Sequence, residues 1–340
     1  MRSKPPVILI HGGAGGRTPE ADVARRKQVM LEAVTAAAAV LARGSNALDA
    51  AVKAVVVLED DPLFNAGYGS VLNRDGVVEM DASVMAADAN LRAGAVAAVQ
   101  GVRNPIMLAR AVMERTSHVL IVGEGARRLA REVGLKRCRP QALISERAKL
   151  HWQAQTQQLL KTEATGGAPT RSGCGWLAPA RSGHGVRTEP RGSLSGKLGM
   201  VKQGATVGAV ALDKNGGLAA ATSTGGIAGK LPGRVGDSAI IGAGTFADTG
   251  GAASATGTGE AILTVGLCRE AVRALRTVSP SHAALRAIRG LAKATGAQAG
   301  IILLNRRGAY AYAHNAQAMD VACFDPINGA RFFAVRPARF

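Results

Sequence analysis

The chain has 340 residues, 47% of them hydrophobic, which is enough to build the core of one large domain or of two. Its four cysteines show no CxxC or metal-ligand spacing, so neither a disulfide framework nor a cysteine metal site is expected. The formal charge of +18 would suit a nucleic-acid partner, but the basic residues are dispersed and are not interleaved with aromatic ones. A solvated basic surface is therefore the favoured interpretation. No stretch reaches the length of a membrane span or of a secretory leader, so a cytoplasmic protein without a membrane partner is predicted.

The first 145 residues are predicted to alternate between strands and helices. The stretch "VILIHGG" begins as a short buried strand that enters a glycine turn. Because "HGGAGG" lacks both the GxGxxG spacing and a Walker lysine, we expect a tight backbone turn there in preference to a nucleotide site. Asn46 is a candidate N-cap for a helix that follows it. The predicted elements are helices over 20–44, 47–61 and 104–116, a strand or turn and a helix within 118–134, and paired strands at 76–88 and 91–99.

Residues from about 150 to 205 differ in composition from the rest of the chain. They are rich in Gly, Ser, Pro and Arg and show no hydrophobic period, although residues 146–161 could form a marginal helix. Such a composition cannot bury enough apolar area to offset its chain entropy, so a flexible, basic linker is predicted. A structureless stretch of this length inside a compact domain requires a functional reason.

Regular structure is expected again from Thr206 onwards. Residues 206–226 read as a strand, a turn and a second strand, and thus as a hairpin. Strands followed by helices and then by strands, without strand–helix alternation in this half, indicate a layered α+β protein. The remaining predicted elements are short strands within 238–248 and 251–260, amphipathic helices over 260–276 and 280–296, and a closing hairpin over 299–315.

Few residues carry recognisable chemistry. Arg234 and Asp237 lie three residues apart in the glycine-rich "LPGRVGDS", where they offer a fork for a carboxylate and an anion for an ammonium group, although a salt-bridged turn is an equal reading. The turn "ATGTGE" could cradle an oxyanion with its backbone N–H groups. The histidines, His11 among them, stand in no metal or triad pattern, and we expect them to be structural.

Thr206 stands where the floppy composition gives way to a buried strand. A threonine hydroxyl is a weak nucleophile unless a base adjoins it, and one solution is to make the threonine N-terminal so that its own α-amine is that base. The reference pKa of an α-amine is about 7.7–8.0, close to working pH, so no histidine is needed. This interpretation requires cleavage of the Ala205–Thr206 bond, and it would explain the flexible segment before it.

Several stretches resemble the isoaspartyl peptidase/L-asparaginase family, the plant-type asparaginases among the N-terminal-nucleophile hydrolases. The resemblance implies a four-layer αββα sandwich and a precursor that cuts itself into an α chain, residues 1–205, and a β chain, residues 206–340. Together the two chains would form one domain, assembled as an (αβ)₂ particle. The matching stretches are "HGGAGG", "LEDDPLFNAGYGSVLNRDGVVEMDASVM", "NPIMLARAVMERTSHVLIVGEGA", "TVGAVALDKNGGLAAATSTGGIAGKLPGRVGDSAIIGAGTFAD" and "ATGTGEAIL".

The resemblance also implies a role for individual residues. Thr206 would be the nucleophile, with Thr224 hydrogen-bonded to it, while Asn65 would face the scissile bond during self-cleavage. Arg234 would hold the α-carboxylate of the substrate and Asp237 its α-ammonium. The oxyanion hole would consist of Thr256 and Gly257, with Gly259 nearby.

The loop from Leu58 to Tyr68 resembles the sodium-binding loop of the same family. The ion would be structural and bound by backbone carbonyls, and no cofactor is implied for the chemistry. The implied ligands are the carbonyls of Leu58, Glu59, Asp61, Phe64, Ala66 and Tyr68.

The sequence thus predicts a self-processing threonine amidohydrolase that cleaves β-aspartyl peptides and L-asparagine and releases L-aspartate. Ala205 stands where the family usually has Gly or Asp, and its Cβ is expected to slow processing. The alternatives are a glycosylasparaginase-type hydrolase, an unprocessed and inactive binding homologue, and a basic protein that associates with nucleic acid. Salt-sensitive nucleic-acid affinity would favour the last of these.

Overall fold

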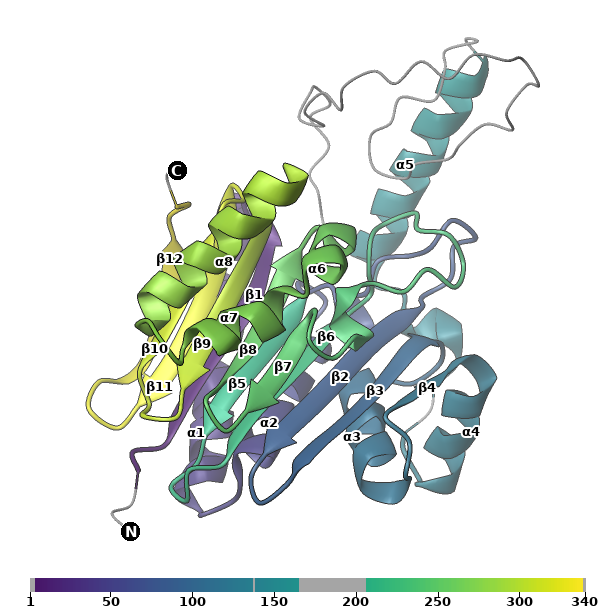
Figure 1. Cartoon of the computed structure of the whole chain (residues 1–340). Helices are drawn as coiled ribbons and strands as arrows, with labels where there is room; N and C mark the ends of the chain where they lie inside the picture. The colour runs from purple at the N-terminus through teal and green to yellow at the C-terminus, as the bar shows by residue number, and fades with distance from the viewer. Residues whose placement is uncertain (1–3, 137, 165–205, 339–340) are drawn as a thin grey trace, which may run out of the picture.

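The computed structural model describes residues 4–136, 138–164 and 206–338, and within them the chain is a mixed α+β protein with two sheets (Figure 1). The larger sheet has the strand order β12-β11-β1-β5-β6-β2-β3-β4, and all its neighbours are antiparallel except β3 and β4. Its strands are β1 (Val7–Gly15), β2 (Met80–Ala87), β3 (Leu91–Val99), β4 (Leu120–Val122), β5 (Val207–Leu212), β6 (Leu218–Thr224), β11 (Ala318–Asp325) and β12 (Gly329–Val335).

The smaller sheet comes wholly from the part of the chain after Thr206. Its strand order is β10-β9-β8-β7, all antiparallel. The strands that the sequence predicted for this half are therefore confirmed. The expected closing hairpin does not end the fold, because β11 and β12 follow it and add the outer edge of the larger sheet. The strands are β7 (Thr245–Asp248), β8 (Gly251–Gly257), β9 (Ala299–Asn305) and β10 (Tyr310–His314).

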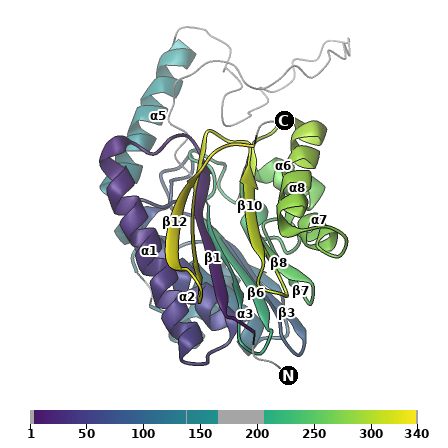
Figure 2. The ribbon, with the colours of Figure 1, turned by 90° about the vertical axis from the view of Figure 1, so that its left-hand side faces the viewer.

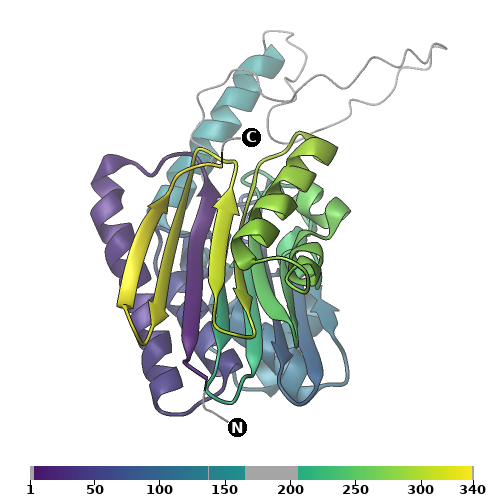
Figure 3. The same ribbon diagram turned by 60° about the vertical axis from the view of Figure 1, so that its left-hand side comes forward.

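Helices lie on the two outer faces, as Figures 2 and 3 show. On one side α1, α2 and α3 pack against the larger sheet, and on the other α7 and α8 pack against the smaller one. Between them the sheets contact each other, β5 and β6 lying against β8. The helices are α1 (Glu20–Ala42), α2 (Ala47–Glu59), α3 (Pro105–Arg115), α4 (Gly123–Glu132), α5 (Glu146–Ala164), α6 (Gly259–Val265), α7 (Leu267–Ala274) and α8 (Pro280–Thr295).

The central strands are apolar on both faces because both faces are covered. In β1 the side chains alternate, so that Ile8 and Ile10 join the core under α1 and α2 while Val7 and Leu9 join the core between the sheets. All four are at most 2% exposed. Many of the surrounding buried residues are alanines, which lets the layers approach closely, as the scarcity of aromatic residues predicts.

Three sequence predictions need correction. The expected turn at "HGGAGG" is wrong, because β1 continues to Gly15 through an irregularity between His11 and Ala14, where Gly13 has a φ of 108°. The helix expected over 260–276 is broken, because Gly266 adopts a left-handed conformation (φ 62°) that ends α6 and starts α7. The linker was placed from about residue 150, but α5 extends to Ala164; residues 165–205 lie outside the described part of the chain.

Candidate active site

The β5–β6 hairpin positions the first pair of candidate residues. Thr206 stands immediately before β5 and is 6% exposed, and Thr224 is the last residue of β6. Since Val207 pairs with Ser223, the two threonines meet at the same end of the hairpin. The hydroxyl of Thr206 donates a hydrogen bond of 3.2 Å to that of Thr224, which also accepts the Gly226 N–H at 3.0 Å. The contact expected between these two threonines is therefore present.

Asn65 ties its own loop to the end of β6. Its amide Nδ2 donates to the Gly226 carbonyl at 2.7 Å, and its backbone carbonyl accepts the Gly225 N–H at 3.0 Å. Its Oδ1 accepts the Val71 N–H at 2.9 Å, so both the amide nitrogen and the amide oxygen of the side chain have a partner. The structure thus brings Asn65 next to Thr224. The bond that Asn65 was expected to face begins at Ala205, which lies outside the described residues.

Asp81 was not predicted from the sequence. It connects this end of β6 to the loop that carries Arg234 and Asp237. It is fully buried and pairs with Thr224 across β2 and β6. One carboxylate oxygen accepts the Gly236 N–H at 2.9 Å, and the other accepts the N–H of Ala98 at 2.9 Å. Ala98 has a φ of 51°, a left-handed conformation that is costly for alanine. Only the three-dimensional pairing of β2 with β6 reveals this residue, since nothing in its local sequence marks it.

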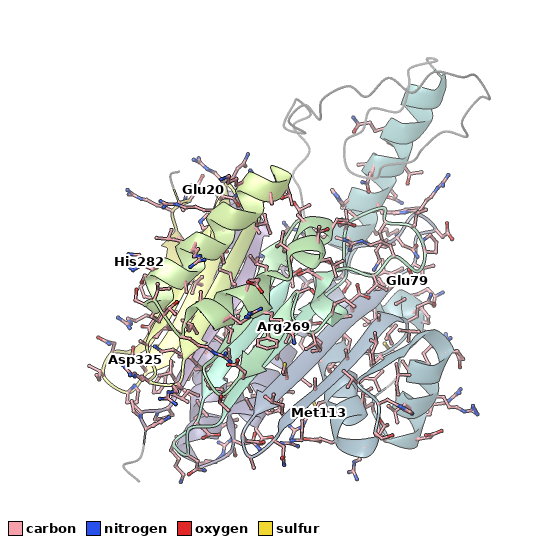
Figure 4. The ribbon with its side chains drawn as sticks, in the orientation of Figure 1. Glu20, Glu79, Met113, Arg269, His282 and Asp325 are labelled. Atoms are coloured by element: carbon pink, nitrogen blue, oxygen red, sulfur yellow. The ribbon has the colours of Figure 1, made fainter. Side chains whose placement is uncertain are left out.

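A second carboxylate supports the same loop. Glu79 (labelled in Figure 4) is 6% exposed, and its Oε2 accepts the Gly233 N–H at 3.0 Å. Its backbone carbonyl accepts the Lys230 ammonium at 2.9 Å. Burial lowers the pKa of Lys230, while the charges of Asp81 and Glu79 act against that shift. The loop that carries Arg234 and Asp237 is therefore fixed at two backbone N–H groups. The Glu79 carboxylate accepts from Gly233, and the Asp81 carboxylate accepts from Gly236.

Arg234 and Asp237 converge on Gly259, the first residue of α6. A Cβ at Gly259 would come within 2.8 Å of both the Arg234 guanidinium and the Asp237 carboxylate, so a side chain at this position would crowd both groups. The fork of Arg234 is occupied by Glu260, whose Oε1 accepts from Nε at 2.9 Å and from Nη2 at 2.7 Å. Glu260 is 59% exposed and Arg234 is 16% exposed, so the partner of the arginine is the more accessible of the two.

Asp237 is a buried carboxyl with free hydrogen-bonding capacity. Its pKa is raised to about 7, chiefly by burial; a hydrogen bond to its own backbone and the charge of Arg234 act against this rise, and the charges of Asp81 and Glu260 contribute to it. Within the described residues its Oδ2 has no hydrogen-bond partner. An unsatisfied buried acceptor is costly unless a ligand supplies the donor. The arrangement suits a ligand that carries an ammonium group.

Thr256 and Gly257, the expected oxyanion residues, end β8. The hydroxyl of Thr256 is buried and accepts the Ala14 N–H of β1 at 3.1 Å. Gly257 is exposed and has a φ of 136°, and a Cβ there would lie 2.5 Å from the Gln298 carbonyl, so only glycine fits. Thr256 is thereby connected to the glycine-rich end of β1, which was not expected from the sequence.

The residues of the expected sodium loop form a tight curl after α2. A Cβ at Gly67 would overlap the Glu59 carbonyl, and one at Gly69 would overlap the Phe64 carbonyl, so these oxygens face the second half of the loop. The carbonyls of Asp61, Phe64 and Ala66 each accept one backbone N–H, which leaves each a second lone pair, while the carbonyl of Leu58 accepts two, from Asp60 and Asp61. Carbonyl oxygens with a free lone pair are the kind of donor that a hard cation takes.

His11 lies alongside β5, opposite Gly208 in the β1–β5 ladder. It is fully buried, and burial lowers the pKa of its imidazole to about 3, an effect that the nearby Thr206 backbone only partly offsets. The ring is neutral at any working pH and is a poor general base. This is consistent with the expectation of a structural histidine.

A cavity of about 80 Å³ has Asn65 in its wall. Arg26 and Asp320 line it and form an ion pair of 3.0 Å, while neither Thr206 nor Arg234 contributes to its wall. The candidate site is therefore defined by the hydrogen bonds around Thr206 and Asp237 and not by this cavity. Among the described residues, no group of three metal-ligating side chains occurs, and no helix is both long and apolar enough to cross a membrane.

The chain is similar to several known proteins. The profile of the family described as "Asparaginase" matches residues 4–329. An isoaspartyl peptidase/L-asparaginase of Mus musculus is 40% identical over 311 residues, which cover 89% of this chain and 82% of the mouse protein. A plant-type L-asparaginase of Pyrococcus abyssi is 41% identical over 317 residues, 93% of this chain and 95% of its own. An isoaspartyl peptidase of Salmonella typhimurium is 44% identical over 236 residues, 68% of this chain and 66% of its own.

Proposed function

This chain belongs to the asparaginase family, and from that membership and its site geometry we propose that it is an amidohydrolase that cleaves β-aspartyl peptides and L-asparagine and releases L-aspartate. The observation that carries the proposal is the buried Thr206 at the start of β5, hydrogen-bonded at 3.2 Å to Thr224. The names of the relatives supply the substrate class. The expected recognition residues Arg234 and Asp237 lie together next to the same hairpin end, which is consistent with that class.

The chain would activate itself by cleavage before Thr206. In this step the Thr206 hydroxyl attacks the Ala205 carbonyl, the C–N bond between the two residues breaks, and the acyl group passes to the hydroxyl oxygen as an ester. Water then hydrolyses the ester and leaves an α chain, residues 1–205, with a free carboxylate and a β chain that begins with the Thr206 amine. Asn65 and Thr224 would hold the hairpin end during the attack, since both bind the Gly225–Gly226 backbone or its neighbour.

Hydrolysis of substrate would repeat the same chemistry on a side-chain amide. The free α-amine of Thr206, with a reference pKa of about 7.7–8.0, would take the hydroxyl proton as the oxygen attacks the carbonyl carbon. The proton would pass to the departing amine or ammonia as the amide bond breaks. Water would then attack the acyl-enzyme and release aspartate. Thr256 and Gly257 are the proposed donors to the oxyanion, and Thr224 would orient the nucleophile.

Recognition of the aspartyl part would fall to Arg234 and Asp237. The guanidinium would bind the α-carboxylate once Glu260 leaves its fork, and the unpaired Oδ2 of Asp237 would accept from the α-ammonium. Gly259 would leave the space that both groups need. Because the ammonium stabilises the ionised carboxyl, substrate binding would lower the pKa of Asp237 from its raised value in the free protein.

Four finer features are proposed with the function. The packing of helices and sheets supports a four-layer αββα sandwich of the N-terminal-nucleophile type. A structural sodium ion would be held by the backbone carbonyls of residues 58–68, and it takes no part in the chemistry. We also propose an (αβ)₂ assembly and a cytoplasmic location.

Mass spectrometry of the purified chain after prolonged incubation tests the proposal. We expect two fragments whose masses sum to that of the 34.7 kDa chain plus one water, the smaller starting at Thr206, together with release of aspartate from L-asparagine and from a β-aspartyl dipeptide. Persistence of the uncut chain without either activity would favour an inactive binding homologue. Hydrolysis of a glycosylated asparagine in preference to both substrates would favour a glycosylasparaginase.

A further inference from the structure

A row of five buried polar side chains crosses the space between the two sheets. Each is completely shielded from solvent, although the surrounding core is apolar. We call this row the buried relay. Its members are His11 on β1, Ser254 on β8, Thr222 on β6, Thr245 on β7 and Ser83 on β2.

Consecutive members of the buried relay are joined by short hydrogen bonds. Nε2 of His11 lies 2.9 Å from the Ser254 hydroxyl, which lies 2.7 Å from the Thr222 hydroxyl. Thr245 donates to Thr222 at 2.6 Å. The row ends with the Ser83 hydroxyl, which lies 2.7 Å from that of Thr245. Each hydroxyl therefore has at least two polar neighbours, as a buried polar network requires.

One end of the buried relay meets the strand that begins at the candidate nucleophile. His11 pairs with Gly208, two residues after Thr206. A Cβ at Gly208 would overlap the Ser254 hydroxyl and lie 2.5 Å from His11 Nε2, so both side chains press directly on the β5 backbone. The position of β5 at its first residues is thus set by His11 and Ser254, the first two members of the relay.

The other end meets the segment that carries Asp237. Ser83 donates to the carbonyl of Ser238 at 2.6 Å, and Thr222 donates to the carbonyl of Gly244 at 3.1 Å. The Gly244 N–H in turn donates to the Asp237 carbonyl at 3.1 Å. The relay therefore fixes the backbone that follows Asp237, at Ser238 and at Gly244.

We propose that the buried relay sets the distance between the Thr206 hydroxyl and the Asp237 carboxylate, and that its members are positioning residues for hydrolysis. The inference rests on the proposed function. Apolar side chains of similar volume would fill the same space without polar groups to satisfy, so stability alone does not require hydroxyls here. Fully paired hydroxyls instead admit only one relative placement of β1, β2, β6, β7 and β8.

The two ends should affect different kinetic constants. Ser83→Ala releases the Ser238 carbonyl, so we expect KM for L-asparagine to rise about tenfold with kcat and the self-cleavage rate within twofold of wild type. Ser254→Ala leaves room beside Gly208, so we expect self-cleavage and kcat to fall about tenfold with KM within twofold. Thr222→Val, in the middle of the relay, should show both effects.

Thr245 provides a conservative pair, and Thr295 a matched control. Thr245→Val should reproduce the KM rise of Ser83→Ala, and Thr245→Ser, which keeps the hydroxyl, should restore the wild-type KM. Thr295→Val makes the same change on α8, where the hydroxyl donates to the Leu291 carbonyl at 2.7 Å, outside the relay. If Ser83→Ala does not accumulate as folded protein, Thr245→Val measures the same end.

The experiment is a set of progress curves for self-cleavage and steady-state kinetics on L-asparagine, with a Tm for every variant. The relay is refuted if Ser83→Ala and Ser254→Ala change the same kinetic constants. It is also refuted if the KM, kcat and self-cleavage rate of all relay variants stay within twofold of those of Thr295→Val, or if the loss of activity follows the loss of Tm alone. A wild-type chain that neither cuts before Thr206 nor releases aspartate refutes the proposed function instead. A wild type that does both while the ends fail to separate refutes only the relay.

Discussion

The two ends of the candidate site differ in how completely their polar groups are satisfied. At the nucleophile end, Thr206, Thr224 and Asn65 are buried, and their hydrogen bonds close on one another or on the Gly226 backbone. At the recognition end, Asp237 carries a buried oxygen that has no hydrogen-bond partner among the residues that the structure describes. There Arg234 is paired with a carboxylate that is 59% exposed. Each of the three nucleophile-end side chains thus has a partner within the described chain, whereas Asp237 keeps free capacity for a ligand.

This difference follows from what each end has to do. A nucleophile is effective when it is already oriented before the reaction, so its partners are best built into the fold. A recognition group must exchange its partner for the substrate, and a group fully paired within the protein would gain little from that exchange. Changes at the first end should therefore reduce the rate of chemistry, and changes at the second should mainly alter substrate affinity.

The largest effect is expected at the nucleophile. Thr206→Ala removes the hydroxyl proposed to attack the Ala205 carbonyl, so the chain should remain a single 34.7 kDa species and should release no aspartate. Gel electrophoresis and N-terminal sequencing measure the first outcome, and an aspartate assay measures the second. Thr224→Ala is the matched comparison, because it keeps the attacking oxygen and should slow cleavage without preventing it. Cutting of Thr206→Ala at the same bond would exclude attack by this hydroxyl.

The nucleophile end was predictable from the sequence because its signal is local. Thr206 lies at the boundary between two compositions, the hairpin that follows it has a recognisable turn, and the family resemblance supplied its contact with Thr224. The family resemblance added Asn65, which is 161 residues away in the sequence from its hydrogen-bond partner Gly226. The α+β class and most strands followed from hydrophobic period and turn residues.

The supports of the recognition end were not predictable in this way. Asp81 reaches the site through the pairing of β2 with β6. Glu260 follows Gly259, which the resemblance placed near the oxyanion hole, and its contact with Arg234 was not expected. The bulged continuation of β1 depends on contacts of its glycines with side chains from distant segments, Phe64 among them. The break at Gly266 depends on α6 and α7 packing differently, which helical periodicity alone does not reveal. Each of these features is set by tertiary contacts that have no fixed sequence spacing.

The next largest effect is expected at Asp237. Asp237→Asn removes the charge proposed to bind the α-ammonium, so the transition-state stabilisation measured by kcat/KM for L-asparagine should fall by about 3–5 kcal/mol, the scale for losing one partner of a buried charge pair. Self-cleavage should continue, because it needs no substrate ammonium. Kinetics and mass spectrometry on the same preparation separate the two. Loss of both activities together would show that Asp237 supports the nucleophile end and not recognition alone.

The raised pKa of Asp237 also predicts a pH dependence. Its value in the free protein is about 7, so the carboxyl is increasingly neutral as the pH falls below 7 and increasingly ionised above it. Since only the ionised form attracts the ammonium, KM should rise about tenfold per pH unit below 7 and should level off above it. KM measured from pH 5.5 to 8.5 tests this, with Asp237→Asn as the variant that should lack the rise. A KM that is flat through pH 7 would contradict the assignment.

A smaller loss is expected from Arg234→Lys. The lysine keeps the positive charge but loses the planar fork, so the transition-state stabilisation measured by kcat/KM should fall by about 1.5–3 kcal/mol, the range for a charge-assisted hydrogen bond. The loss should vanish for an amide that lacks the α-carboxylate, because such a substrate gives the fork nothing to bind. Comparison of L-asparagine with its des-carboxy analogue in both proteins measures the difference. An equal loss on both substrates would mean that Arg234 acts through the structure of the loop.

The smallest effect, and the only one expected to improve binding, concerns Glu260. Its Oε1 lies 2.7 and 2.9 Å from two nitrogens of the Arg234 fork, so a substrate carboxylate has to displace it or share the guanidinium with it. Because Glu260 is 59% exposed, solvent screens the pair and its strength is about 0.2–1 kcal/mol. Glu260→Gln should therefore lower KM for L-asparagine by no more than about fivefold and leave kcat unchanged. Added salt should reduce the gap between variant and wild type, because it weakens the same competition. A higher KM in Glu260→Gln would show the opposite role, in which Glu260 holds Arg234 in the geometry that the substrate needs.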